Sequence, residues 1–168
     1  MKVLVATASK HGATQEIGEA LGAALRDAGL DVSVTGADAV GSVAGYDAVV
    51  LGSAIYAGRW MEPAKRLITR EGDTLRAKPV WLFSSGPAGD PPLPEGDPAD
   101  APILVELVGA RGHRVFAGKI DRGRLGFAEK AIVAVVKAPD GDFRPWEDVR
   151  AWAGEIAAEL ARVGEPIG

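Results

Sequence analysis

The chain has 168 residues, of which 47% are hydrophobic and 25% are charged, and these proportions are typical of a folded globular protein. It contains no cysteine, which excludes disulfides, thiolate metal ligands and thiol catalysis, so any redox chemistry must come from a bound cofactor. The net charge is −4, but residues 111–137 contain seven basic and two acidic residues and carry +5, which leaves −9 for the rest. This basic segment is either a solvated surface or a face for an anionic partner.

The first half of the chain alternates predicted strands with predicted helices. A buried strand is predicted at residues 3–7, and a helix at 15–26, where apolar residues recur every three or four positions. A short strand follows at 31–35, and then a continuous apolar strand at 47–52. Residues 61–70 are predicted as the second helix.

The second half continues this alternation. A fourth strand is predicted at residues 79–84, a helix at 99–108 and a fifth strand at 114–117. A long amphipathic helix at 146–163 completes the pattern. Residues 125–137 fit either a helix or a strand, because apolar residues at helical spacing coincide with a β-branched run.

Alternating strands and helices indicate βαβ units, in which helices cover both faces of a parallel sheet. The proline- and glycine-rich stretch 87–97 is too short to link two domains. We therefore predict a single α/β domain over residues 1–168, a three-layer sandwich whose five-stranded parallel sheet has the order 2-1-3-4-5. In this order, ligands lie beyond the carboxyl ends of the strands, beside the first strand.

The segment between the first predicted strand and the first helix reads Ser-Lys-His-Gly-Ala-Thr. A helix start offers unpaired N–H groups and a partial positive charge, which suit a phosphate. Ser9 and Thr14 can add hydroxyl donors, and Gly12 lets the backbone close around an anion. Lys10 either pairs with the phosphate or points into solvent, and His11 is either a loop residue or an acid–base group. The alternative is an ordinary strand-to-helix turn.

Two further predicted loops follow the third and fourth strands. The loop at 52–60 contains Tyr56 and Trp60, whose flat apolar rings suit contact with a flat aromatic ligand, although Ile55 and Trp60 could equally seal the core. The loop at 84–87, Ser-Ser-Gly-Pro, has small residues that let the main chain approach the carbonyl edge of a ring, or is an ordinary turn. The chain lacks the glycine motifs of dinucleotide- and triphosphate-binding loops.

Over nearly its whole length the chain resembles the flavodoxin family, and within it the flavodoxin-domain group that contains the menaquinone-dependent protoporphyrinogen dehydrogenases. The resemblance lies in SKHGATQEI at residues 9–17, in VLGSAIYAG at 50–58, and in the segment between the fifth strand and the 146–163 helix. It implies a flavodoxin-like fold and FMN, with the phosphate in the first loop and the ring between the other two. The predicted cofactor-binding residues are Ser9, Lys10, His11, Gly12, Ala13, Thr14, Ser53, Ala54, Ile55, Tyr56, Ala57, Gly58, Ser84, Ser85 and Gly86.

Three functions are compatible with this pattern. The first is an FMN oxidoreductase that oxidises a porphyrinogen in haem biosynthesis and reduces a quinone, with Arg122 and Arg124 near the anionic substrate. The second is a flavodoxin-type electron carrier with a redox protein partner, and the third is a flavodoxin-like module without flavin. In each flavin case the cofactor carries the chemistry, and no catalytic side chain is identified.

The remaining expectations concern partners and location. We expect no metal site and no nucleic-acid partner. We expect no signal peptide, since Met1-Lys2-Val3 leads directly into a predicted strand, and no stretch of the sequence is apolar over the length needed to span a bilayer. We therefore expect a cytoplasmic protein, with peripheral contact at the inner face of the membrane as the alternative.

Overall fold

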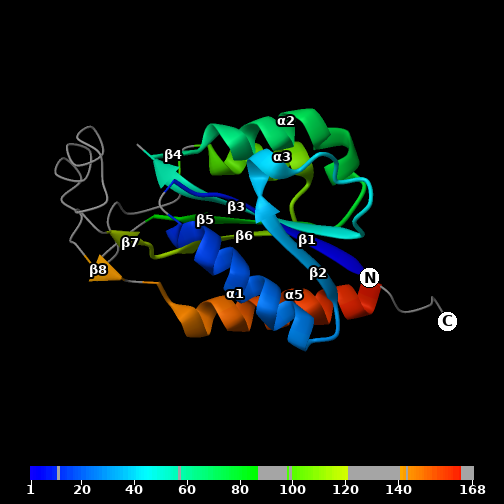
Figure 1. Ribbon diagram of the computed structural model, residues 1–168. Coiled ribbons are helices and arrows are strands. Elements are labelled where there is room, and N and C mark those ends of the chain that lie inside the picture. The colour runs from blue at the N-terminus through cyan, green and yellow to red at the C-terminus, as the bar shows by residue number, and fades with distance from the viewer. Residues whose placement is uncertain are drawn as a thin grey trace.

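The computed structural model describes residues 1–10, 12–56, 58–86, 98, 100–120, 141–142 and 144–163. Five parallel strands form its sheet in the order β2-β1-β3-β5-β6, which confirms the predicted order once the short antiparallel β4 is set aside (Figure 1). The parallel strands are β1 (Lys2–Ala8), β2 (Asp31–Gly36), β3 (Ala48–Tyr56), β5 (Val80–Ser85) and β6 (Gly112–Phe116).

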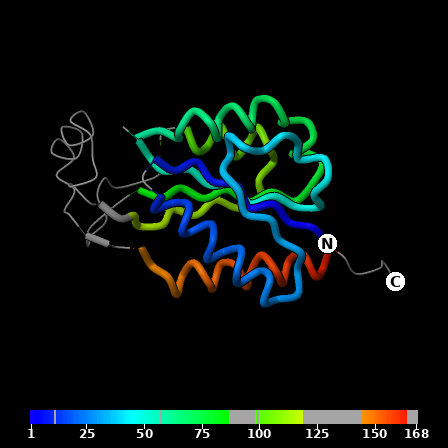
Figure 2. The backbone as a smooth tube through the Cα atoms, viewed as in Figure 1, coloured from blue at the N-terminus to red at the C-terminus, as the bar shows by residue number. Residues whose placement is uncertain are grey.

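Helices cover both faces of this sheet, which confirms the flavodoxin-like three-layer sandwich (Figure 1). On one face lie α1 and α5, and these two helices run side by side beneath the strands in Figure 2. On the other face lie α2, α3 and the short 3-10 helix η1. The bounds are α1 (Ala13–Asp27), η1 (Ala37–Ala39), α2 (Glu62–Arg76), α3 (Ala101–Val108) and α5 (Trp146–Val163).

Alternate residues of strand β1 pack into the two hydrophobic cores on opposite faces of the sheet. Val3 and Val5 point into the core beneath α1 and α5, whereas Leu4 points into the core beneath α2 and α3. All three side chains are fully buried, because helices cover the sheet on both sides. Glycines let α1 pack closely: a Cβ at Gly18 would lie 2.6 Å from Cγ2 of Thr7.

The third strand is longer than the sequence pattern indicated. Its predicted end was residue 52, but β3 continues to Tyr56 and pairs antiparallel with β4 (Arg59–Trp60). Residues predicted as a loop therefore form a hairpin, whose turn contains Gly58 with a φ of 77°. The β-branched Ile55 and the aromatic Tyr56 favour the extended backbone, and pairing with β4 supplies its hydrogen bonds.

Two other boundaries differ from the prediction. Strand β5 includes Ser85 as well as Ser84, which the predicted strand already contained. Helix α2 continues to Arg76, beyond its predicted end at residue 70, because Leu75 is fully buried in the same core as Leu67. The other predicted elements begin and end within two residues of the observed ones. The predictions at 87–97 and 125–137 lie outside the described residues.

A second, two-stranded sheet was not predicted. It joins β7 (Lys119–Ile120) to β8 (Gly141–Asp142) in antiparallel fashion, with Lys119 opposite Asp142. Strands of two residues cannot be predicted from the sequence, because they are too short to show an alternation of apolar and polar residues. The pair brings the chain after β6 back beside the start of α5.

Candidate functional site

The three segments predicted to bind a cofactor meet at one edge of the sheet. Ser53 of β3 lies opposite Ala8 of β1 on one side and Ser84 of β5 on the other. Because these are adjacent parallel strands, their carboxyl ends reach the same edge, on the left in Figure 1. The structure therefore brings together residues that are 31 and 45 positions apart in the sequence.

The first segment is a closed turn that leads into α1. The N–H of Gly12 donates a 3.0 Å hydrogen bond to Oγ of Ser9, and the carbonyl of Gly12 accepts one from the N–H of Glu16. Gly12 has a φ of 88°, a left-handed conformation that favours glycine. Among the described residues no side chain caps this helix start, and the N–H groups of a first helical turn have no partner within the helix.

The other members of this segment have distinct environments. Thr14 lies in the first turn of α1 and is almost fully buried. Lys10 extends toward the second segment, where its Nζ lies 5.0 Å from the centroid of the Tyr56 ring. This contact connects the first two segments at the carboxyl edge of the sheet. His11 and Ala57, both predicted to contact the cofactor, lie outside the described residues.

The second segment presents one aromatic ring and buries the other. Tyr56 is 38% exposed at the end of β3, whereas Trp60 is 2% exposed in the α2/α3 core. Of the two interpretations of Trp60, the structure therefore shows the one in which it seals the core. The buried hydroxyl of Ser53 accepts the N–H of Met61 at 2.9 Å and donates to the carbonyl of Ala54 at 2.8 Å. These bonds fix the base of the hairpin.

In the third segment, the side chain of Ser84 is buried, and Gly86 contributes only main-chain atoms. Oγ of Ser84 accepts the indole N–H of Trp60 at 2.7 Å and lies 2.7 Å from Nε2 of His113, so this hydroxyl belongs to the core. Gly86 donates its N–H to the carbonyl of Phe116 at 3.3 Å. A Cβ at Gly86 would lie 2.8 Å from Cβ of Ile55. The main chain therefore passes close to β3 here, and glycine is needed for this packing because Ile55 fills the place of a side chain.

Sequence reasoning missed Asp100, a buried polar partner of Trp60 and of α2. The carboxylate of Asp100 accepts the backbone N–H of Trp60, at 3.2 Å to Oδ2, and lies 3.5 Å from Nζ of Lys65. An aspartate immediately before Ala-Pro is a recognisable start of a helix. In the structure, however, the Asp100 carboxylate makes no capping bond to α3 and turns to the β3–β4 hairpin instead.

Arg144 was also missed. Its Nη1 lies 3.5 Å from the carbonyl oxygen of Ala13 and forms an ion pair with the carboxylate of Glu16, both in the first turn of α1. No local pattern could have shown this contact, because 128 residues separate Arg144 from Glu16.

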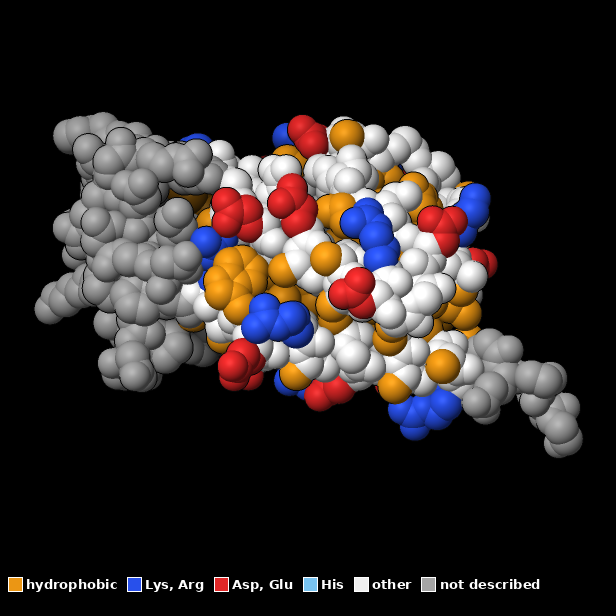
Figure 3. All heavy atoms as spheres, turned by 60° about the horizontal axis from the view of Figure 1, so that its bottom comes forward, with side chains coloured by type: hydrophobic (Ala, Val, Ile, Leu, Met, Phe, Trp, Pro, Cys, Tyr) orange, Lys and Arg blue, Asp and Glu red, His pale blue; other side chains and the backbone are white. Residues whose placement is uncertain are grey.

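Two arginines in the described part of the basic segment pair with α5. Arg111 lies 3.3 Å from Glu159, and Arg114 lies 2.9 Å from Glu155. On the face that carries α1 and α5, basic and acidic side chains are interspersed (Figure 3). Arg122 and Arg124, the two predicted substrate contacts, lie outside the described residues.

Comparison with known proteins agrees with this architecture. The flavodoxin domain family matches residues 4–144, so the chain belongs to that family. None of the curated protein sequences matches it significantly. No helix within the described part of the chain combines the length and apolar character needed to cross a bilayer.

Solved structures show the same fold at low identity. A flavodoxin from the domain Archaea superposes with a TM-score of 0.65 at 17% identity, covering 96% of this chain and 99% of that one. A Pseudomonas aeruginosa flavodoxin variant gives 0.64 at 19% identity, with 96% and 99% covered. The rubredoxin oxygen:oxidoreductase of Desulfovibrio gigas gives 0.66 at 14% identity, but this chain spans only 37% of it.

Proposed function

We propose that the protein binds FMN at the carboxyl edge of the sheet and acts as an electron carrier. The carrying observation is the convergence there of an uncapped helix start, an exposed tyrosine ring and a close main-chain passage at Gly86. When bound, FMN supplies reversible electron transfer, and the protein positions it and sets its potential.

The phosphate fits the turn before α1. This helix has 15 residues, so its amino end has a developed partial positive charge, and its first-turn N–H groups can donate to the phosphate oxygens. The Ser9 hydroxyl accepts the N–H of Gly12 and retains its own proton for donation. Thr14 supplies a second hydroxyl from the first helical turn. Hydrogen bonds from neutral donors to a charged phosphate contribute about 1.5–3 kcal/mol each.

The flavin ring fits between the ends of β3 and β5. Tyr56 offers the exposed aromatic surface, and offset stacking on such a ring contributes about 0.5–1.5 kcal/mol beyond burial. Ala54 and Ser85 are neighbours across the two strands, and Gly86 follows them without a side chain. None of these three residues has a long side chain that would obstruct a flat ligand.

An electron carrier is the better supported of the two flavin functions. The solved flavodoxins are matched over 99% of their length, which supports a flavodoxin-type carrier with a redox protein partner. The two arginines predicted to contact a porphyrinogen, Arg122 and Arg124, lie outside the described residues, and Arg111 and Arg114 of the same basic segment pair with α5. The dehydrogenase therefore remains a prediction that only an assay can decide.

The experiment is a pair of assays on the FMN-loaded protein. In the first, a flavodoxin reductase and NADPH reduce the protein, which then reduces cytochrome c. In the second, protoporphyrinogen is oxidised with a menaquinone analogue as acceptor. We expect activity in the first assay and none in the second. Activity in the second alone would replace the carrier by the dehydrogenase, and a protein that takes up no FMN would contradict both.

A further inference from the structure

We infer that Arg144 is a positioning residue for the phosphate end of the FMN site, and this inference rests on the function proposed above. Arg144 precedes α5 and is distant in sequence from the phosphate turn, yet it contacts the first turn of α1. Its guanidinium lies against the carbonyl of Ala13 and pairs with the carboxylate of Glu16. Ala13 is the first residue of α1, so the contact is at the end of the helix that faces the phosphate.

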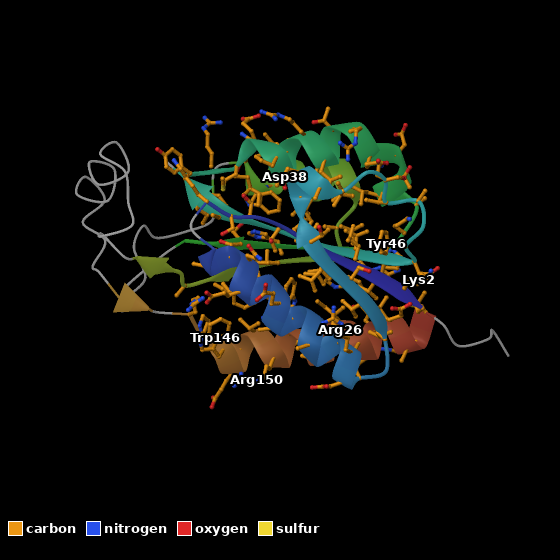
Figure 4. The ribbon with its side chains drawn as sticks, viewed as in Figure 1. Lys2, Arg26, Asp38, Tyr46, Trp146 and Arg150 are labelled. Carbon is orange, nitrogen blue, oxygen red and sulfur yellow. The ribbon has the colours of Figure 1, made fainter. Side chains whose placement is uncertain are left out.

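The guanidinium is held in place before any ligand binds. The Arg144 side chain is only 6% exposed, and its Cζ lies 4.5 Å from the centroid of the Trp146 ring. Trp146 is the first residue of α5 and lies at the end of α5 next to the start of α1 (Figure 4). Its N–H donates to the carbonyl of Arg144 at 3.1 Å, which fixes the backbone between them. A planar guanidinium suits this combination of ring stacking and carboxylate pairing.

The ion pair changes the charge that a phosphate meets at the helix start. Glu16 is in the first turn of α1, and its side chain is 53% exposed. A carboxylate there repels a phosphate dianion bound to the same turn, because like charges a few ångströms apart interact unfavourably even in a high dielectric. Arg144 compensates the Glu16 charge. Phosphate affinity therefore depends on Arg144 through Glu16, without direct contact between Arg144 and the ligand.

If Arg144 acts on the phosphate, its replacement should change the affinity for FMN but not the affinity for riboflavin, which lacks the phosphate. Arg144→Gln should weaken FMN binding about three- to tenfold, the size expected of one uncompensated charge near a dianion, and leave riboflavin binding unchanged. Glu16→Gln should tighten FMN binding about two- to fivefold, because Arg144 then leaves a net positive charge. The double variant should return FMN affinity close to that of the parent. The loss in Arg144→Gln should shrink at high salt, since salt screens exposed charges.

The test is titration of the parent and the three variants with FMN and with riboflavin, at low and high salt, alongside thermal unfolding. Arg26→Gln is the matched control, because Arg26 donates to the carbonyl of Val32 from the other end of the same helix. We expect it to change stability without altering the preference for FMN over riboflavin. Glu16 is exposed, so Glu16→Gln keeps the inference testable even where Arg144→Gln does not fold.

The outcomes separate this inference from the proposed function. Equal losses of FMN and riboflavin in Arg144→Gln, or no gain in FMN affinity in Glu16→Gln, would overturn the role of Arg144 while leaving the FMN site intact. A parent that binds neither flavin, or binds riboflavin as tightly as FMN, would overturn the phosphate site itself and this inference with it. A preference for FMN that falls in Arg144→Gln and returns in the double variant supports both.

Discussion

The indole N–H of Trp60 donates a 2.7 Å hydrogen bond to Oγ of Ser84, and both residues are buried at the carboxyl edge of the sheet. An indole nitrogen can only donate, so Ser84 must accept this bond. Ser84 can then donate its own proton to Nε2 of His113, 2.7 Å away. The bond ties the β3–β4 hairpin to β5, and so holds Tyr56 and Gly86 in their relative places.

Ser84→Ala should therefore destabilise the protein by about 1–3 kcal/mol, the cost of leaving a buried donor without its acceptor. Chemical denaturation of parent and variant measures this difference. Ser33→Ala is the control, because Ser33 is exposed on β2 and its replacement should change stability by less than about 0.5 kcal/mol. Equal stabilities for Ser84→Ala and Ser33→Ala would show that the Trp60–Ser84 bond does not stabilise the hairpin.

Two glycine-to-alanine substitutions should act in opposite directions. A Cβ at Gly52 would lie 2.1 Å from Cζ of Phe83, so Gly52→Ala overpacks the middle of the sheet and should cost about 1–3 kcal/mol or more. Gly154 lies in α5 with open space around its Cβ direction, so Gly154→Ala should stabilise by about 0.5–1 kcal/mol through helix propensity. Thermal unfolding decides both signs, and a stabilised Gly52→Ala would contradict the packing described here.

Tyr56 should serve the flavin ring and not the phosphate. Tyr56→Ala removes a stacking contribution of about 0.5–1.5 kcal/mol and should weaken FMN and riboflavin to the same degree, by about two- to tenfold. Tyr56→Phe keeps the ring and should bind both flavins as the parent does. Fluorescence titration with the two ligands measures this. A loss confined to FMN would place Tyr56 near the phosphate instead.

The parallel arrangement was readable from the sequence because each βα unit has its own periodicity, and five strands with a ligand-type loop after the first indicated the order of the sheet. That order placed the third and fourth predicted strands side by side, and the structure pairs Ser53 with Ser84 across them. The pattern could not show that β3 continues to Tyr56, because the extension depends on pairing with Arg59 and Trp60. Local periodicity does not contain hydrogen bonds made between separate elements.

The environments of single side chains were harder still. Trp60 fitted both a ring contact and a core position, and its burial against Ser84 and Asp100 follows only from the assembled fold. Arg144 gave no signal at all, since Ala13 and Glu16, which it contacts at the start of α1, are far away in the sequence. Which residues share an edge was therefore predictable, and which polar groups pair there was not.

The most direct test of the account is calorimetric titration of FMN into the parent and into Ser9→Ala/Thr14→Ala, with Ser33→Ala/Thr69→Ala as the matched exposed control. The parent and the control should bind one FMN per chain with equal affinity. The Ser9/Thr14 variant should bind FMN about ten- to a hundredfold more weakly, from the loss of two hydrogen bonds to a charged group with partial rescue by water, and should bind riboflavin as the parent does. FMN affinity that is the same in all three proteins, or absent from the parent, would contradict the placement of FMN at this edge.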